Sequence, residues 1–328
     1  MTRVSADLSA LVRDGRRDVV RALEAEGADV VAVHVEGRDT IATGWNKAIA
    51  SARGNRLLFL DGRCSPLPGL VARCARFLTS HPASDVLRLG VARGAATRST
   101  ILADWLWSSG RLVAEPSGAG IYTWPHFRLT LLACRRDLLS AVSFDERFAA
   151  LEDLELGVRV AAAGPLRVHF DPMPHALFDS APTIDEALRA EYAEGYYRAL
   201  RVRVNPSAPS LDDLADRFAF PEAFALTTAA EREALRTSAV ALADTIDPSE
   251  LPFIDGDASA RLALLHSLYE QLFSDAAARG WLDAEGATNA DATAPPRAAS
   301  GRRPASARTS ASGRTGCRRR RESCWNRR

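Results

Sequence analysis

The sequence predicts an α/β protein whose mostly parallel sheet is flanked by helices, followed by an α-helical extension and a disordered tail. In residues 1–182, short β-branched or apolar runs alternate with segments of helix length, which is typical of a parallel sheet covered by helices. Residues 183–285 contain helical segments and no good strand. Residues 286–328 are rich in Ala, Ser, Arg, Pro and Gly and lack periodicity. We therefore expect three parts with these boundaries.

Composition narrows the class of protein. The chain has 328 residues, of which 47% are hydrophobic and 25% charged, as in ordinary globular proteins. We find no apolar run of the roughly 18–20 residues that a membrane span needs, and no signal-peptide core at the N-terminus. The five cysteines form no CxxC pair and are odd in number, which indicates reduced thiols. These observations predict a cytoplasmic protein.

Charge is unevenly distributed along the chain. The net charge is +1, but residues 291–328 contain 11 Arg, no Lys and 2 acidic residues, so this tail carries +9 and the rest −8. A basic tail can bind an anionic surface, such as nucleic acid or lipid, weakly and in a salt-dependent way. Its lack of periodicity equally fits an unstructured end with no binding role.

The first third of the chain contains the elements that lead to the first candidate site residue. An apolar stripe predicts a helix over 8–26, which Gly27 would end. A strand is expected at 29–35 and a short helix near 41–52. The near-continuous apolar run 56–60 suits a strand buried on both faces, and Asp61 follows it directly. Because ligands of open α/β sheets bind at the carboxyl ends of strands, Asp61 is a candidate site residue.

The middle of the chain continues the alternation up to an acidic helix start. The sequence predicts, in order, a helix at 69–80, a strand at 85–91, an irregular aromatic region at 97–128, a strand at 129–134, a short helix at 135–142, a helix from 151 and a strand at 166–170. Glu152, Asp153 and Glu155 crowd the first turn of the helix from 151, where the helix dipole stabilises negative charge. A solvated acidic helix start would look the same.

Three stretches occur in a characteristic order. The first, 44–69, contains Asn46, the run Phe59-Leu60-Asp61 and Arg63. The second contains Phe144-Asp145-Glu146-Arg147-Phe148 followed by Leu151-Glu152-Asp153-Leu154. The third is Pro174-His175. Together they resemble the motifs of family 2 glycosyltransferases, the inverting class with the GT-A fold, over about residues 35–180.

The resemblance implies a GT-A sheet and the transfer of a sugar, with inversion, from a nucleotide-sugar donor to a hydroxyl of a glycan or natural product. Asp153 matches the general base of the family and Glu152 its positioning partner. Asn46, Asp61 and Arg63 match donor-binding positions. Asp61 and His175 would hold Mg²⁺ or Mn²⁺, whose preferred ligands include carboxylates. Trp124 and His126 lie where the family places acceptor-facing residues.

The sequence also departs from the family pattern. Arg63 stands where the second acid of the Asp-x-Asp motif would hold the metal, although a guanidinium can pair with a diphosphate directly. The N-terminal strands with which the family binds the nucleotide are not found, so the core is expected to be N-terminally incomplete. The alternative interpretation is therefore an inactive or truncated remnant of this fold that acts as a binding or assembly module. Under either interpretation, we expect the helical extension to cover the acceptor side or to mediate homo-oligomerisation.

Overall fold

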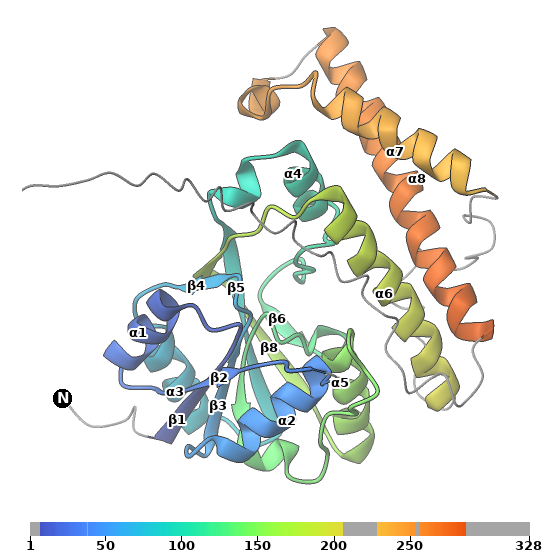
Figure 1. Cartoon of the computed structure of the whole chain (residues 1–328). Helices are drawn as coiled ribbons and strands as arrows, with labels where there is room; N and C mark the ends of the chain where they lie inside the picture. The colour runs from blue at the N-terminus through green and yellow to red at the C-terminus, as the bar shows by residue number, and fades with distance from the viewer. Residues whose placement is uncertain (1–6, 38, 206–227, 254–255, 287–328) are drawn as a thin grey trace, which may run out of the picture. The chain divides into compact units, whose positions relative to one another are not determined.

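The computed structural model describes residues 7–37, 39–205, 228–253 and 256–286, and these residues build a sheet of eight strands (Figure 1). The strands are β1 (Leu8–Arg13), β2 (Asp29–Val33), β3 (Arg56–Leu60), β4 (Cys64–Pro66), β5 (Asp85–Arg93), β6 (Gly120–Tyr122), β7 (Leu131–Arg135) and β8 (Arg167–Phe178). Seven of them follow the order β2-β1-β3-β7-β5-β8-β4, and β6 pairs with β8.

Most of the long strands run in one direction. β1 is parallel to both β2 and β3, and β5 is parallel to β8. β7 lies between β3 and β5 and is antiparallel to both, so β3 and β5 share a direction. The short strands β4 and β6 are antiparallel to β8. The predicted α/β class with a mostly parallel sheet is therefore confirmed.

Helices cover both faces of this sheet (Figure 1). Because successive strand residues point to opposite faces, Leu57 and Phe59 of β3 enter one hydrophobic cluster and Leu58 and Leu60 enter the other. The first cluster includes side chains of α2 (Ile41–Ser51) and α5 (Glu152–Ala163), and the second includes side chains of α1 (Arg17–Ala25) and α3 (Leu70–Ser80).

The N-terminal segment differs from the prediction. Residues 8–13 form β1, between β2 and β3, and only the second half of the predicted helix is helical, as α1. Ser9 conceals the strand pattern, because it is a polar residue on a fully buried strand. Its hydroxyl donates to Asp29 Oδ2 at 2.9 Å and accepts from the Gly54 N–H at 2.9 Å, so its burial is compensated. A strand–helix–strand unit thus precedes α2, and the expected absence of N-terminal strands is not confirmed.

Two smaller elements also differ from expectation. The region predicted to be irregular contains the helix α4 (Ile101–Ser108) and a short 3-10 helix before it, Ala96–Arg98. The helix predicted at 135–142 is a 3-10 turn, Arg136–Leu139. A further 3-10 turn, Trp124–His126, follows β6. The segment between β5 and β7 therefore consists mostly of short helices and loops. These loops form one wall of the candidate site.

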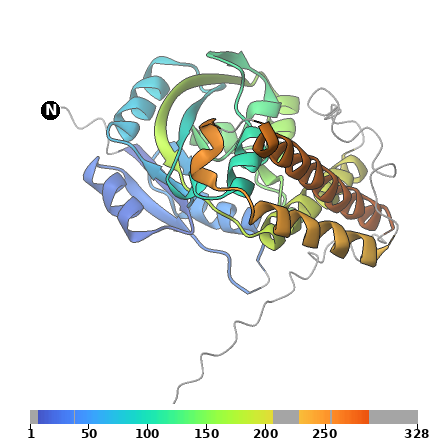
Figure 2. The same cartoon turned by 90° about the horizontal axis from the view of Figure 1, so that it is seen from above.

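The helical extension consists of α6 (Ile184–Val204), α7 (Ala229–Ala243), a 3-10 segment (Pro248–Phe253) and α8 (Gly256–Gly286) (Figure 2). Thr183 and Thr228 begin α6 and α7 with capping boxes, in which a glutamate three residues later returns the hydrogen bond. Within the residues described, no helix is both long and apolar enough for a membrane crossing. The predicted tail falls outside the described residues apart from Gly286, and self-association stays a prediction.

Candidate functional site

The candidate site lies at the carboxyl ends of β1 and β3 and at the start of α5. Arg13 ends β1, and Asp61 follows β3. The two strand ends are in direct contact, because a Cβ added to Gly62 would come within 2.1 Å of the Arg13 carbonyl oxygen. The positive charge of Arg13 favours the ionised forms of both Asp61 and Glu152. Arg13 therefore acts electrostatically on two predicted site residues, and it was missed because the sequence pattern of residues 8–26 predicts a helix rather than β1.

Arg63 holds the carboxylate of Asp61 in a two-pronged ion pair. Arg63 Nε donates to Asp61 Oδ1 at 2.8 Å and Nη2 donates to Oδ2 at 2.9 Å, while the Arg63 backbone N–H donates to Oδ1 at 2.9 Å. Burial raises the pKa of Asp61, but the hydrogen bonds and charge of Arg63 outweigh it, so the pKa lies below its ordinary value. Asp61 is 8% exposed, whereas 46% of the Arg63 side chain is exposed. Arg63 therefore stays partly accessible to solvent while it holds Asp61.

The residues predicted to bind a metal do not fit a divalent cation. Both oxygens of Asp61 are already bonded to Arg63. His175 lies inside β8 rather than after it, with Nε2 at 3.3 Å from Asp171 Oδ2, and Asp171 is also paired with Arg73. Across the described part of the chain, no group of three or more His, Cys, Asp or Glu side chains is arranged to hold a metal. In the described residues Asp61 and His175 thus each have a different protein partner, and a metal site formed by these two residues stays a prediction.

Glu152 is the buried first residue of α5. Leu151, before it, has the left-handed φ of 58°, which turns the chain into the helix. Glu152 is 9% exposed, and its Oε1 accepts from Trp45 Nε1 at 3.3 Å. Burial, and then the charge of Asp153, raise the pKa of Glu152 to about 7. Its partner Trp45 is in the core, so the observed contacts of Glu152 fix the start of α5.

Asp153 points to the other side, toward the loop before β7. Its Oδ2 accepts from the Leu129 N–H at 3.2 Å and lies 3.3 Å from Arg128 Nε. Its Oδ1 accepts from the Leu154 N–H at 2.8 Å. The side chain is 13% exposed. Asp153 is therefore a carboxylate held in one orientation next to Arg128 and Leu154, which both line a cavity.

Asn46 holds the loop before α5 in place. Its Oδ1 accepts from the Phe144 N–H at 2.9 Å, and its Nδ2 donates to the Phe144 carbonyl at 3.0 Å and to Glu146 Oε1 at 3.0 Å. Thr40, at the start of the same helix, donates to the Glu146 carbonyl at 2.9 Å. The observed partners of Asn46 are thus protein groups, and its predicted contact with a donor stays a prediction.

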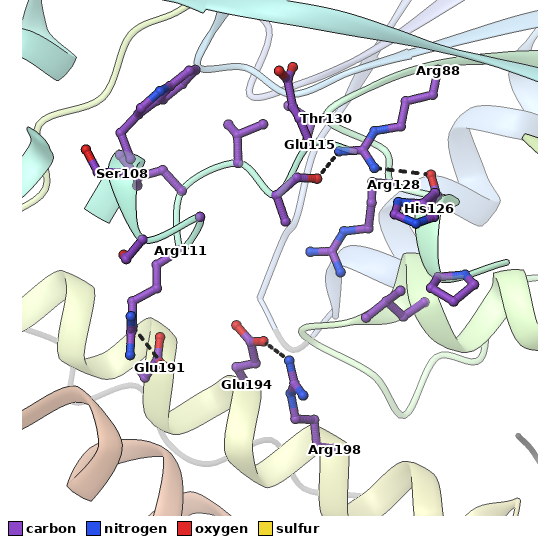
Figure 3. Close-up of a pocket in the computed structure, with 18 residues that line it drawn as sticks. Arg88, Ser108, Arg111, Glu115, His126, Arg128, Thr130, Glu191, Glu194 and Arg198 are labelled. Carbon is purple, nitrogen blue, oxygen red and sulfur yellow. Dashed lines mark hydrogen bonds and ion pairs between the residues drawn. The ribbon is translucent and has the colours of Figure 1, made fainter. Parts of the chain in front are cut away.

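A cavity of about 490 Å³ extends from this edge toward α6 (Figure 3). Charged side chains dominate its lining: Arg88, Arg111, Arg128 and Arg198, with Glu115, Glu191 and Glu194. Thr130 also lines it, and the Thr130 carbonyl accepts from the Asp61 N–H at 3.1 Å. A second cavity of about 400 Å³ contains Arg63 in its lining and shares Arg111, Leu112, Glu191 and Glu194 with the first. Arg63 therefore lines one of two neighbouring cavities, and Arg128, the partner of Asp153, lines the other.

The two predicted acceptor residues have different positions. His126 lines the 490 Å³ cavity, and burial together with the charges of Arg88 and Arg128 lowers its pKa to about 4. Trp124 is 9% exposed, belongs to the core cluster and lies 5.3 Å from the Arg201 guanidinium. It is not among the residues that line this cavity, so it is not placed to stack on a ligand there.

Sequence reasoning missed the arginines and glutamates of the cavity. Arg88 interrupts an otherwise apolar strand, and that polar residue in a buried run was the one available signal. Glu191, Glu194 and Arg198 come from α6, whose role could not be assigned before its position was known. Burial and the charge of Glu194 raise the pKa of Glu191 to about 7.

No protein-family model and no curated protein match the chain. Among solved structures, it is similar to the mannosyltransferase PcManGT from Pyrobaculum calidifontis in complex with GDP-Man and Mn²⁺ (16% identity, 85% of this chain and 87% of that one, TM-score 0.45). It is also similar to S. aureus TarS 1-349 in complex with UDP-GlcNAc (14%, 86% and 93%, TM-score 0.47). A third is glucosyl-3-phosphoglycerate synthase from Mycobacterium tuberculosis (13%, 57% and 78%, TM-score 0.38). Because all these identities and TM-scores are low, the activity has to be inferred from the chain's own residues.

Proposed function

We propose that the protein is a glycosyltransferase that moves a sugar from a nucleotide-sugar donor to a hydroxyl acceptor, with Asp153 as general base. One arrangement carries this proposal: Arg128, the ion-pair partner of Asp153, and Arg63, the partner of Asp61, line two neighbouring cavities that share four lining residues, and Asp61 directly follows β3. The order of Asn46, Asp61, Asp153 and His175 along the chain, which resembles family 2 glycosyltransferases, supports the same reaction.

Asp153 has the geometry to accept a proton from an acceptor hydroxyl. An ionised carboxylate offers about four lone-pair positions. The Leu129 and Leu154 N–H groups and the Arg128 guanidinium approach three of them, so about one is left for a hydroxyl. Deprotonation by a positioned base makes the hydroxyl oxygen a better nucleophile. Attack of that oxygen on the anomeric carbon in a single displacement would invert the configuration.

The leaving diphosphate requires positive charge, and arginines are placed to supply it. Arg63 uses Nε and Nη2 for Asp61, and within the described residues Nη1 forms no hydrogen bond, so it can donate to a diphosphate oxygen. Arg13 lies at the end of the neighbouring strand, with 40% of its side chain exposed. Because the carboxylates do not fit a cation, no step in this proposal passes through a metal.

A non-catalytic binding or assembly module is the second candidate function. The contacts of Asp153 with Arg128 and the two backbone N–H groups also favour this function, because a carboxylate paired in this way can have a purely structural role. Such a module would still bind a ligand in the cavities but would not turn it over.

The test is nucleotide-sugar turnover by the wild type and by Asp153→Asn. With a panel of UDP- and GDP-sugars, we expect Asp153→Asn to lose about 10²–10⁴-fold in rate, the usual contribution of a general base. Asp18→Asn, at the exposed start of α1, is the matched control and should keep full activity. Equal rates for wild type and Asp153→Asn would rule out the base.

Calorimetry with UDP and GDP separates the two candidate functions. Nucleotide binding without turnover by any donor would favour the binding module. Absence of nucleotide binding would contradict the glycosyltransferase proposal altogether.

A further inference from the structure

The guanidinium of Arg88 lies buried at the cavity without an ion-pair partner among the residues that the structure describes (Figure 3). Arg88 is on β5 and is 3% exposed. It donates to the Ala114 carbonyl and, at 3.5 Å, to the His126 carbonyl. The charge of Glu115 acts on Arg88, but the Glu115 carboxylate accepts from the Val91 N–H at 2.8 Å. Arg88 is thus a buried cation with only neutral hydrogen-bond partners.

The other arginines of the same cavity are each paired with a carboxylate. The pairs and their N···O distances are Arg111–Glu191 at 3.4 Å, Arg198–Glu194 at 2.5 Å and Arg128–Asp153 at 3.3 Å. A buried charge is costly unless it is paired. Burial, and then the charge of Arg128, lower the pKa of Arg88 to about 10, so Arg88 still carries its charge at neutral pH. A bound anion would supply the ion-pair partner that Arg88 lacks.

His126 indicates the sign of the potential at this end of the cavity. It lines the same cavity, and its carbonyl accepts from Arg88. After burial, the causes that lower its pKa to about 4 are the charges of Arg88 and Arg128. A neutral histidine beside two arginines leaves net positive charge there, which is offset in part by Asp153, 3.3 Å from Arg128 Nε.

We propose that Arg88 and Arg128 form a subsite for an anionic group, a phosphate or a carboxylate, that the acceptor carries. This inference rests on the proposed glycosyl transfer. Arg128 lies 3.3 Å from Asp153, so an anion on Arg128 brings the rest of the acceptor next to the base. The donor diphosphate has a cation of its own, because Arg63 lines the neighbouring cavity. The acceptor is therefore an anionic hydroxyl compound rather than a neutral sugar.

Binding of inorganic phosphate to the full chain tests the subsite directly. Calorimetric titrations at constant ionic strength would compare phosphate with acetate, as the carboxylate probe, and with glycerol, as the neutral one. We expect phosphate or acetate to bind, glycerol not to bind, and Arg88→Gln to weaken anion binding about tenfold or more. Arg76→Gln, on the exposed face of α3, is the matched control and should bind as the wild type does. No anion binding by the wild type, or equal binding by Arg88→Gln, would overturn the proposal.

A second measurement covers the case in which Arg88→Gln does not fold. In the wild type, phosphate at the subsite adds negative charge near His126, so its pKa should rise from about 4, which NMR titration of the imidazole can follow. Arg128→Gln, whose side chain is 29% exposed in the wild type, should weaken the same response. An imidazole titration that phosphate leaves unchanged would show that the anion binds elsewhere.

Competition with nucleotide assigns the anion to acceptor or donor. We expect phosphate to bind equally well in the presence of saturating UDP or GDP. Displacement of phosphate by the nucleotide would assign Arg88 and Arg128 to the donor diphosphate and overturn the acceptor assignment. If neither nucleotide binds while phosphate does, the subsite stands and the proposed glycosyl transfer fails.

Discussion

Arg63 occupies both carboxylate oxygens of Asp61, with Nε at 2.8 Å from Oδ1 and Nη2 at 2.9 Å from Oδ2. This pair replaces the two acids that would share a cation in an Asp-x-Asp motif. A guanidinium is permanently charged and matches a diphosphate with its fixed donors. The pair therefore points to a site whose positive charge belongs to the protein.

The Arg63–Asp61 pair should prevent the wild type from binding a divalent metal at this site. We expect the wild type to form no stoichiometric Mn²⁺ complex, as measured by electron paramagnetic resonance, and transfer activity to change less than about twofold on chelation, because the Arg63 cation is bonded to both Asp61 oxygens. Arg63→Met should release the Asp61 carboxylate and increase Mn²⁺ binding, whereas Arg76→Met should not. A stoichiometric Mn²⁺ site in the wild type would show that Asp61 can bind a cation in spite of Arg63.

Asn46 should matter for the position of α5 as well as for stability. Asn46→Ala leaves the N–H and C=O of the buried residue Phe144 without their partners. Two unsatisfied buried groups cost about 2–4 kcal/mol, so the urea midpoint should fall clearly and activity should fall with it. Asn55→Ala, at an exposed position, should change the midpoint little. Full stability of Asn46→Ala would show that the loop finds other partners.

The longer strands and most helices from residue 29 onward could be predicted, because apolar runs, turn residues and helix periods agree there, whereas α4, β4 and β6 were not predicted. β1 could not, since Ser9 breaks its apolar pattern and its buried polar contacts come from Asp29 and Gly54, distant in sequence. Among the site residues, Asp61 and Asp153 could be identified from the sequence because they belong to recognisable motifs. Arg88 and Glu191 did not, because β5 and α6 are about a hundred residues apart and only the fold brings them to one cavity.

Glu152 should make stability depend on pH. Its folded pKa of about 7 lies above the ordinary value of 4.5, so between these values the folded protein holds a proton that the unfolded chain has released. The free energy of unfolding therefore falls as pH rises through this window. Glu152→Gln keeps an acceptor for Trp45 and should match the wild type near pH 4.5 but exceed it by about 1–3 kcal/mol near pH 8.

Urea denaturation at the two pH values measures this difference. Glu24→Gln, exposed on α1, is the control and should not alter the pH dependence. If Glu152→Gln shows the same pH dependence as the wild type, Glu152 is ionised in the folded protein across the whole window.

The close packing of α6 against α8 should control the position of the cavity wall that α6 forms. A Cβ on Gly195 of α6 would come within 2.0 Å of the Ala277 carbonyl oxygen, and one on Gly280 of α8 within 2.0 Å of the Tyr192 carbonyl oxygen. Gly195→Ala must therefore push the two helices apart. It should also displace the turn of α6 from which Glu191 and Glu194 contribute to the cavity lining. We expect a loss of about 1–3 kcal/mol in stability from this overpacking.

The same substitution distinguishes a wall from a separate helical unit. If α6 is part of the site, Gly195→Ala should weaken phosphate or acceptor binding even at temperatures where the protein stays folded. Gly118→Ala, whose Cβ would meet no atom within 4 Å, is the control and should leave both properties unchanged. Displacement of helix residues that contact the ligand would change the ligand affinity. Normal binding by a folded but destabilised Gly195→Ala protein would therefore show that Glu191 and Glu194 do not contact the ligand.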